Sequence, residues 1–171
     1  LEKMAPDGYD MLALEWEQVL DRKKLLKSVV DRRVEGVLAF PDRRNNVDEH
    51  LLELVNYGIP VVLIDRVLNT KSIQQQFGFV GPDNHNASRL AVEHLVGLGH
   101  KKIGFAARME DAAYSTTNQR YQAYQQAMMN NDLTPQEMII VDNPDLQQSG
   151  GQLTERFLGD NITAVVADND V

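Results

Sequence analysis

Short apolar segments alternate with longer amphipathic segments along almost the whole chain of 171 residues. The short segments are continuously apolar, which is typical of strands that are buried on both faces of a parallel sheet. The longer segments carry apolar residues at helical spacing, so they predict helices that cross over between strands. Right-handed crossovers place such helices on both faces of a sheet, and the predicted fold class is therefore α/β.

The expected elements follow one another in a regular order. We expect strands at residues 9–14, 37–40, 61–64, 77–80, 101–106, 138–141 and 162–167. We expect helices at residues 17–33, around 51–55, and at 83–98, 114–129 and 150–158.

Residues 83–105 contain a helix, a stop and a strand in immediate succession. Asn84 or Asn86 is expected to cap the helix, since a short side-chain oxygen can accept from the N–H groups of the first turn. Gly97 and Gly99 stand where the helix must end, because glycine tolerates the left-handed conformation there. The helical spacing predicts one inward face made of Ala87, Leu90, Ala91, His94, Leu95 and Leu98.

The charge and composition exclude several classes of protein. The formal net charge is -8, and the basic residues do not cluster, so this chain is not expected to bind nucleic acid by itself. The absence of cysteine excludes a thiolate metal site and fits a cytoplasmic protein. No apolar run approaches the roughly 20 residues of a membrane span, and we expect no membrane association.

The groups at the carboxyl ends of the strands are the place to look for a ligand, because parallel α/β sheets bind ligands there. They are mostly carboxylates, amides and arginines, in particular at residues 65–66, 143–145 and 168–170. Such groups suit a polyhydroxy ligand. No phosphate-binding glycine loop, nucleophile elbow or metal-binding histidine pattern is present. We therefore expect no cofactor, no metal and no catalytic residue, which argues against an enzyme of flavodoxin-like topology.

Several motifs occur together in an order and spacing that resembles the lactose-repressor/galactose-repressor (LacI/GalR) regulators. They are Arg33-Val34-Glu35-Gly36-Val37-Leu38, the run GIPVVLIDR at 58–66, Asp83-Asn84 with LAVEHLVGLGHKKI at 90–103, NQRYQAY at 118–124, and Asn169-Asp170. The likeness extends from about Gly8 to Val171. Each motif alone is weak evidence, whereas the complete set is specific.

The resemblance implies a periplasmic-binding-protein-like effector domain, with two Rossmann-like lobes of parallel sheets flanked by helices. Residues 1–99 would form the N-terminal lobe and residues 100–171 the C-terminal lobe, with the first hinge crossover near Gly99-His100. Both lobes would be incomplete, and the helix-turn-helix headpiece would be missing. The implied partners are a sugar-like small-molecule effector, a second copy in a homodimer, and operator DNA contacted only through the headpiece. A sugar-binding protein of a transport system is the alternative.

The same resemblance implies the ligand-binding residues. Family members use an arginine at the helix start that Arg120 occupies, where a guanidinium can clasp two hydroxyls or a carboxylate. Asn169 is implied in the same way, and Thr116 matches a position that can reach the effector. Asp170 would either bind the ligand or cap the following helix.

Four further positions bear on the expected ligand site. Of Asp83 and Asn86, one is expected to cap the helix and the other to face the cleft. Phe40 would form either a wall of the cleft or part of the core. Relatives often carry an aromatic residue that stacks on a sugar at the position that Asp145 occupies here. Either the loop at residues 143–145 aligns differently with the relatives, or hydrogen bonds replace stacking at this point.

Overall fold

The computed structural model describes residues 8, 12–13, 22–41, 47–66, 68, 74–112, 115–141 and 146–169. The chain divides into two compact units, one formed by residues 1–62 and 68–78 and the other by residues 63–67 and 79–171. The expected strand at 9–14 and the loop at 143–145 lie wholly or mostly outside the described residues.

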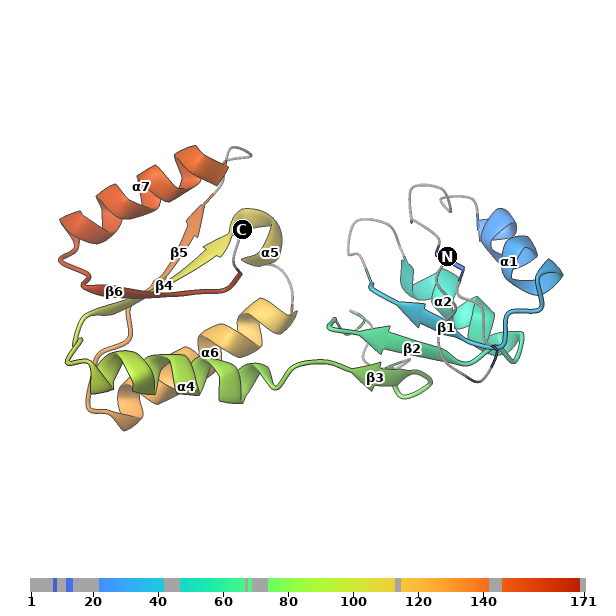
Figure 1. The fold of residues 1–171 in the computed structure, drawn as a ribbon, viewed down its shortest axis with the longest axis horizontal. Helices are drawn as coiled ribbons and strands as arrows, with labels where there is room; N and C mark the ends of the chain where they lie inside the picture. Colours follow the sequence, from blue (N-terminus) through green and yellow to red (C-terminus); the bar gives the residue numbers. More distant parts are fainter. Residues whose placement is uncertain are drawn as a thin grey trace. The chain divides into compact units, whose positions relative to one another are not determined.

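The first sheet contains three strands in the order β1-β2-β3, and α1 and α2 accompany it (Figure 1). Its elements are α1 (Arg22–Asp31), β1 (Val37–Ala39), α2 (Val47–Asn56), β2 (Val61–Ile64) and β3 (Gly78–Val80). The apolar residues that predicted these elements form their core: Leu51 and Leu54 of α2 and Leu63 of β2 are fully buried. The expectation of an α/β fold with parallel sheets flanked by helices is confirmed.

The second sheet contains three parallel strands in the order β5-β4-β6, so β4 lies in the middle. Figure 1 shows α4 and α6 on one face of this sheet and α7 on the other. The elements are α4 (Asn84–Gly97), β4 (Ile103–Arg108), α5 (Met109–Ala112), α6 (Ser115–Asn130), β5 (Met138–Val141), α7 (Leu146–Gly159) and β6 (Ala164–Ala167). Phe105 faces Met138 on one side and Val166 on the other, which fixes the register of all three strands.

The core of the second unit is built around three aromatic rings from β4 and α6. The rings of Phe105, Tyr121 and Tyr124 lie with their centroids 5.3 to 5.8 Å apart. The Tyr124 hydroxyl donates to the carbonyl oxygen of Ile103 at 2.7 Å and accepts from the backbone N–H of Gln136 at 2.9 Å. Burial raises the pKa of Tyr124, because the phenolate would lose its solvation. This hydroxyl ties α6 both to β4 and to the segment that leads into β5.

Helix α4 begins and ends through local hydrogen bonds. Asp83 is the N-cap, and its carboxylate accepts from the N–H of Asn86 at 2.9 Å. The expectation that one of Asp83 and Asn86 caps the helix is confirmed for Asp83, whereas the expectation of a cap at Asn84 or Asn86 is wrong. A carboxylate fulfils the same function as an amide oxygen and adds negative charge at the positive end of the helix dipole. At the other end Gly99 has φ +91°, and its N–H bonds the carbonyl of Val96 at 2.9 Å, as expected.

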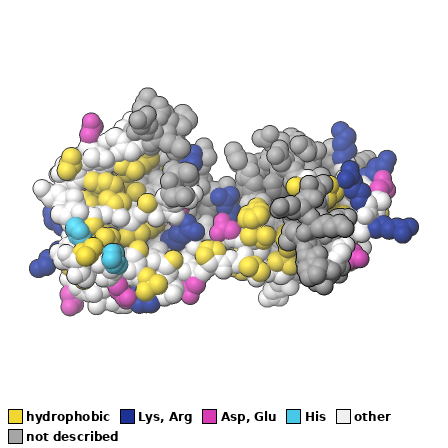
Figure 2. Space-filling view, viewed as in Figure 1, with side chains coloured by type: hydrophobic (Ala, Val, Ile, Leu, Met, Phe, Trp, Pro, Cys, Tyr) yellow, Lys and Arg dark blue, Asp and Glu magenta, His cyan; other side chains and the backbone are white. Residues whose placement is uncertain are grey.

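The inward face of α4 differs from the expected one. Leu90 and Leu98 are 51% and 64% exposed, and His94 is also exposed. The buried residues are Asn84, Ser88 and Val92, with Leu95 partly buried beside them. Ala91 and Leu95 of the expected face do pack against the core, so the hydrophobic pattern predicted the buried face only in part. Figure 2 shows the resulting surface, where hydrophobic and histidine side chains gather over this part of the second unit.

Helix α4 lies in the same compact unit as β4 and α6. Val92 is fully buried in one cluster with Ile103, Phe105 and Tyr124. The two units exchange along the chain after Val62, after Val67 and after Gly78. Gly99 lies in the turn from α4 into β4, and the expected lobe boundary and hinge crossover near residues 99 and 100 stay a prediction. None of the described helices is both long and apolar enough to cross a membrane.

Candidate functional site

Arg120 is held at two of its nitrogen atoms by residues far away in the sequence. Its Nε donates to the Asn84 side-chain oxygen at 2.8 Å. Its Nη1 donates to the backbone oxygen of Asp168 at 2.5 Å and lies 3.4 Å from the carboxylate of the same residue. The side chain remains 24% exposed. No hydrogen bond joins its third nitrogen, Nη2, to any described residue.

Asp168 connects Arg120 to the first turn of α6. The residue follows β6 directly, and its N–H donates to the carbonyl of Ala106 in the central strand at 2.9 Å. Its carboxylate accepts from the hydroxyl of Thr117 at 2.8 Å, and the side chains of both residues are buried. Thr117 and Arg120 stand three positions apart on α6, so they share one face of the helix. The end of β6 is thus fixed to α6 by a carboxylate that contacts both residues.

Asn84 fixes the opposite edge of the guanidinium. It is the first residue of α4 and is buried. Its side-chain oxygen accepts from Arg120, and its side-chain nitrogen donates to the Gln119 oxygen at 3.1 Å. Both ends of the amide are therefore used, which fixes its orientation.

Arg120, Thr117 and Asp168 line a polar cavity of about 220 Å³ in the second unit. Its lining residues are Asp65, Arg66, Thr116, Thr117, Arg120, Asp168 and Asn169. Asp65 follows β2 with φ +66°, a left-handed conformation that is uncommon outside glycine and that concentrates at functional sites. The Arg66 guanidinium lies 3.8 Å from the Asp65 carboxylate. The lining therefore holds two carboxylates and two guanidinium groups, together with hydroxyl and amide groups.

Three of the ligand-binding residues expected from the sequence lie in this cavity. They are Arg120, Thr116 and Asn169. Asp170 lies outside the described residues. Phe40 follows β1 in the first unit and is 60% exposed, so it is not part of that unit's core.

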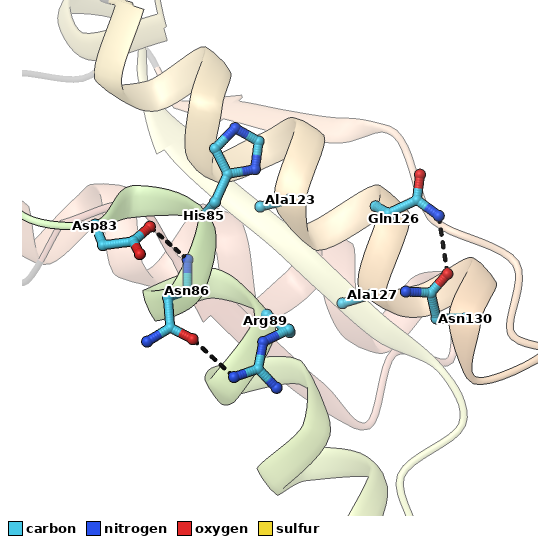
Figure 3. A pocket seen from close by; sticks show the side chains of 8 residues that line it. All are labelled: Asp83, His85, Asn86, Arg89, Ala123, Gln126, Ala127 and Asn130. Atoms are coloured by element: carbon cyan, nitrogen blue, oxygen red, sulfur yellow. Dashed lines mark hydrogen bonds between the residues drawn. The ribbon is translucent and has the colours of Figure 1, made fainter.

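Asp83 and Asn86 line a different hollow, a shallow groove of about 260 Å³ between α4 and α6 (Figure 3). Asp83 caps α4, and the side-chain oxygen of Asn86 accepts from Arg89 at 2.7 Å. On the α6 side Gln126 donates to Asn130 at 2.8 Å. The polar groups of the groove thus bond mostly to neighbours on their own helix.

The sequence placed Asp168 among the strand-end groups where a ligand is expected, but it did not single out Asn84, Thr117 or Asp168 as ligand-binding residues. Asn84 was considered only as a helix cap, although it stands between the two residues that were chosen. The spacing of Thr117 and Arg120 on one helix face was a usable signal, because it places a hydroxyl beside the arginine. No local pattern indicates that Asp168 bonds residues 48 and 51 positions earlier in the chain.

The arrangement of hydrogen-bonding groups is suited to binding a small polar molecule. Among the described residues, no group of three or more histidine, aspartate or glutamate side chains could hold a metal ion. Fixed donors and acceptors around a cavity with partly exposed guanidinium and amide groups can hydrogen-bond a small polar molecule.

The comparisons with known proteins agree with this architecture. The family described as periplasmic binding protein domain matches residues 17–171. The probable HTH-type transcriptional regulator EndR of Paenibacillus polymyxa is 29% identical over 89% of this chain and 43% of its own length. The HTH-type transcriptional repressor PurR of Mannheimia succiniciproducens is 26% identical over 99% of this chain and 50% of its own length.

A solved structure gives the same result. The PurR family transcriptional regulator of Vibrio parahaemolyticus superposes with a TM-score of 0.64 at 26% identity, covering 90% of this chain and 55% of that one. The chain spans about half the length of the curated relatives it matches. It belongs to the periplasmic binding protein domain family, in the form that LacI/GalR-type transcriptional regulators carry.

Proposed function

We propose that this chain is the effector-sensing part of a cytoplasmic transcriptional regulator, and that it binds a sugar or a similar small polar molecule at Arg120. The observation that carries the proposal is the fixed guanidinium at the polar cavity. Two of its nitrogen atoms are held by Asn84 and Asp168, and Nη2 faces no described partner. A pre-oriented arginine can donate to a ligand with little loss of side-chain entropy.

The neighbouring groups supply the rest of a sugar site in this proposal. Asn169 offers both a donor and an acceptor, and Thr116 offers a hydroxyl at the same cavity. Ligand binding would favour one arrangement of the two lobes over another, and a homodimer would transmit the change to the DNA-binding parts. The net charge of -8 supports DNA contacts made by residues outside this chain.

Arginine substitution tests the ligand site. In the full-length protein, Arg120→Ala should abolish the thermal shift given by any sugar found in a screen of neutral mono- and disaccharides. Arg156→Ala is the matched control, since Arg156 lies exposed on α7 and pairs only weakly with Asp160 at 4.0 Å. Circular dichroism establishes that both variants fold. A folded Arg120→Ala protein with an undiminished shift contradicts the assignment.

A sugar-binding protein of a transport system is the second candidate, because the matching family is defined by periplasmic binding proteins. The two functions differ in their response to DNA. A full-length regulator should bind specific DNA fragments from its own genome, and its affinity for them should fall or rise when the sugar is added. A full-length protein that binds the sugar and retains no DNA fragment favours the transport function.

A further inference from the structure

The first turn of α6 and Arg120 together form a place that attracts negative charge. A helix N-terminus favours anions, and the hydroxyl of Thr117 and the guanidinium of Arg120 both donate hydrogen bonds there. The first turn of α6 contains no acidic residue of its own. Such a combination would ordinarily recruit a phosphate or carboxylate group from a ligand.

The chain supplies its own anion at this place. The buried carboxylate of Asp168 accepts from Thr117 at 2.8 Å through one oxygen and lies 3.4 Å from Arg120 through the other. At the cavity lining Asp65 and Arg66 form a second pair of opposite charges. The remaining lining groups, Thr116 and Asn169, are uncharged. Among the described lining residues the charges therefore cancel.

We propose that Asp168 determines the specificity of the site by admitting uncharged polyhydroxy ligands and rejecting phosphorylated or carboxylated ones. This inference rests on the proposed function and names the ligand class for the same cavity. A ligand hydroxyl can accept from Nη2 of Arg120 without disturbing the Asp168 contact. An anionic group at the same place meets the fixed carboxylate of Asp168, and two like charges at close range repel each other in a partly buried site.

Asp168 has a second effect on the guanidinium. Asp168 accepts from Nη1, so Nη2 is the nitrogen that remains for a ligand. Phosphate and carboxylate groups are usually bound by two guanidinium nitrogen atoms at once, and this bidentate contact is no longer possible. Removal of the charge, with retention of the side-chain shape, should convert the site into one that binds anions.

Calorimetric titration with inorganic phosphate tests the proposal directly. The full-length wild-type protein should show no saturable binding at Arg120. Asp168→Asn should bind phosphate at least about tenfold more tightly than wild type, as expected when a like charge is removed from a binding site. The double variant Asp168→Asn/Arg120→Gln should lose the increase in phosphate affinity. Thr117→Val should show no increase in phosphate affinity, because it keeps the Asp168 carboxylate.

Each outcome decides one way. The proposal is overturned if wild type binds phosphate and Arg120→Gln abolishes that binding. It is also overturned if Asp168→Asn folds and binds phosphate no more tightly than wild type. Where Asp168→Asn does not fold, Asp168→Ser replaces it, and the wild-type titration decides by itself if neither folds. The sugar screen on wild type and Arg120→Ala distinguishes failure of the proposed function from failure of the charge selection by Asp168. Sugar binding that Arg120→Ala leaves undiminished rejects the proposed function, whereas wild-type binding of sugars and phosphate with equal affinity at Arg120 rejects only the charge selection.

Discussion

Arg120 and Asp168 meet through two different oxygen atoms, one from the backbone at 2.5 Å and one from the carboxylate at 3.4 Å. The backbone contact fixes the chain just after β6, and the carboxylate contact balances the charge of the guanidinium. Because Asn169 is the next residue, the position of its side chain at the cavity depends on the same bond. The arginine therefore organises the site in addition to offering a donor to the ligand.

Asn84→Ala should weaken sugar binding by about tenfold, which corresponds to about 1.4 kcal/mol. The substitution removes the acceptor for Nε, so Arg120 loses one of the two contacts that orient it. The affinity is measured by calorimetric titration of the sugar that the screen identifies. Asn86→Ala is the matched control, because Asn86 lies two residues away on the same helix and contacts Arg89 at the surface. Equal affinities of wild type and Asn84→Ala would remove Asn84 from the site.

The strands were the easiest part of the fold to predict, because continuous apolar segments have few alternatives. The bounds of β2 and β5 agree with the expected residues 61–64 and 138–141. The orientation of α4 was harder, since its buried face includes Asn84 and Ser88. Hydrophobic periodicity does not detect a helix face whose polar groups are satisfied by partners from another helix.

The site was only partly accessible from the sequence for a related reason. Arg120 was found through the family resemblance, and spacing alone does not distinguish it from a solvated arginine. The hydrogen bonds from Arg120 to Asn84 and from Thr117 to Asp168 join residues 36 and 51 positions apart, so they exist only once α4, α6 and β6 have packed together. The choice of Asp83 and Asn86 failed to find Asn84 because helix phase decides which of three adjacent residues faces α6.

Gly104→Ala should destabilise the protein by about 1–3 kcal/mol, the usual cost of overpacking. A Cβ at this position in β4 would lie 2.8 Å from a ring carbon of Phe157 and 3.2 Å from Ile162, so α7 would have to shift. The free energy of unfolding is measured by urea titration. Gly97→Ala in α4 is the control, because nothing lies within 4 Å of its added Cβ. It should stabilise the protein by roughly 0.5–1 kcal/mol, the helical preference of alanine over glycine. Equal effects of the two substitutions would contradict the close packing of α7 on β4.

Tyr124→Phe should cost about 1–3 kcal/mol of unfolding free energy at neutral pH. The substitution retains the ring and leaves the Ile103 carbonyl and the Gln136 N–H without the hydroxyl that they share. Tyr57→Phe is the control, since Tyr57 is exposed and its loss should change the stability by less than about 0.5 kcal/mol. A fully stable Tyr124→Phe protein would show that the hydroxyl contacts contribute nothing to the packing of α6 on β4.

The same tyrosine predicts how stability changes in alkali. Burial raises the pKa of Tyr124 above its ordinary value of 10.0, so the folded state keeps the proton in a range where the unfolded state has lost it. This contribution to stability is complete below pH 10 and is lost as the pH rises through the folded-state pKa. Within that window the free energy of unfolding should fall by about 1.4 kcal/mol per pH unit more in wild type than in Tyr124→Phe. Urea titrations of both proteins between pH 8 and pH 11 measure the two slopes, and parallel slopes would mean that Tyr124 ionises alike in both states.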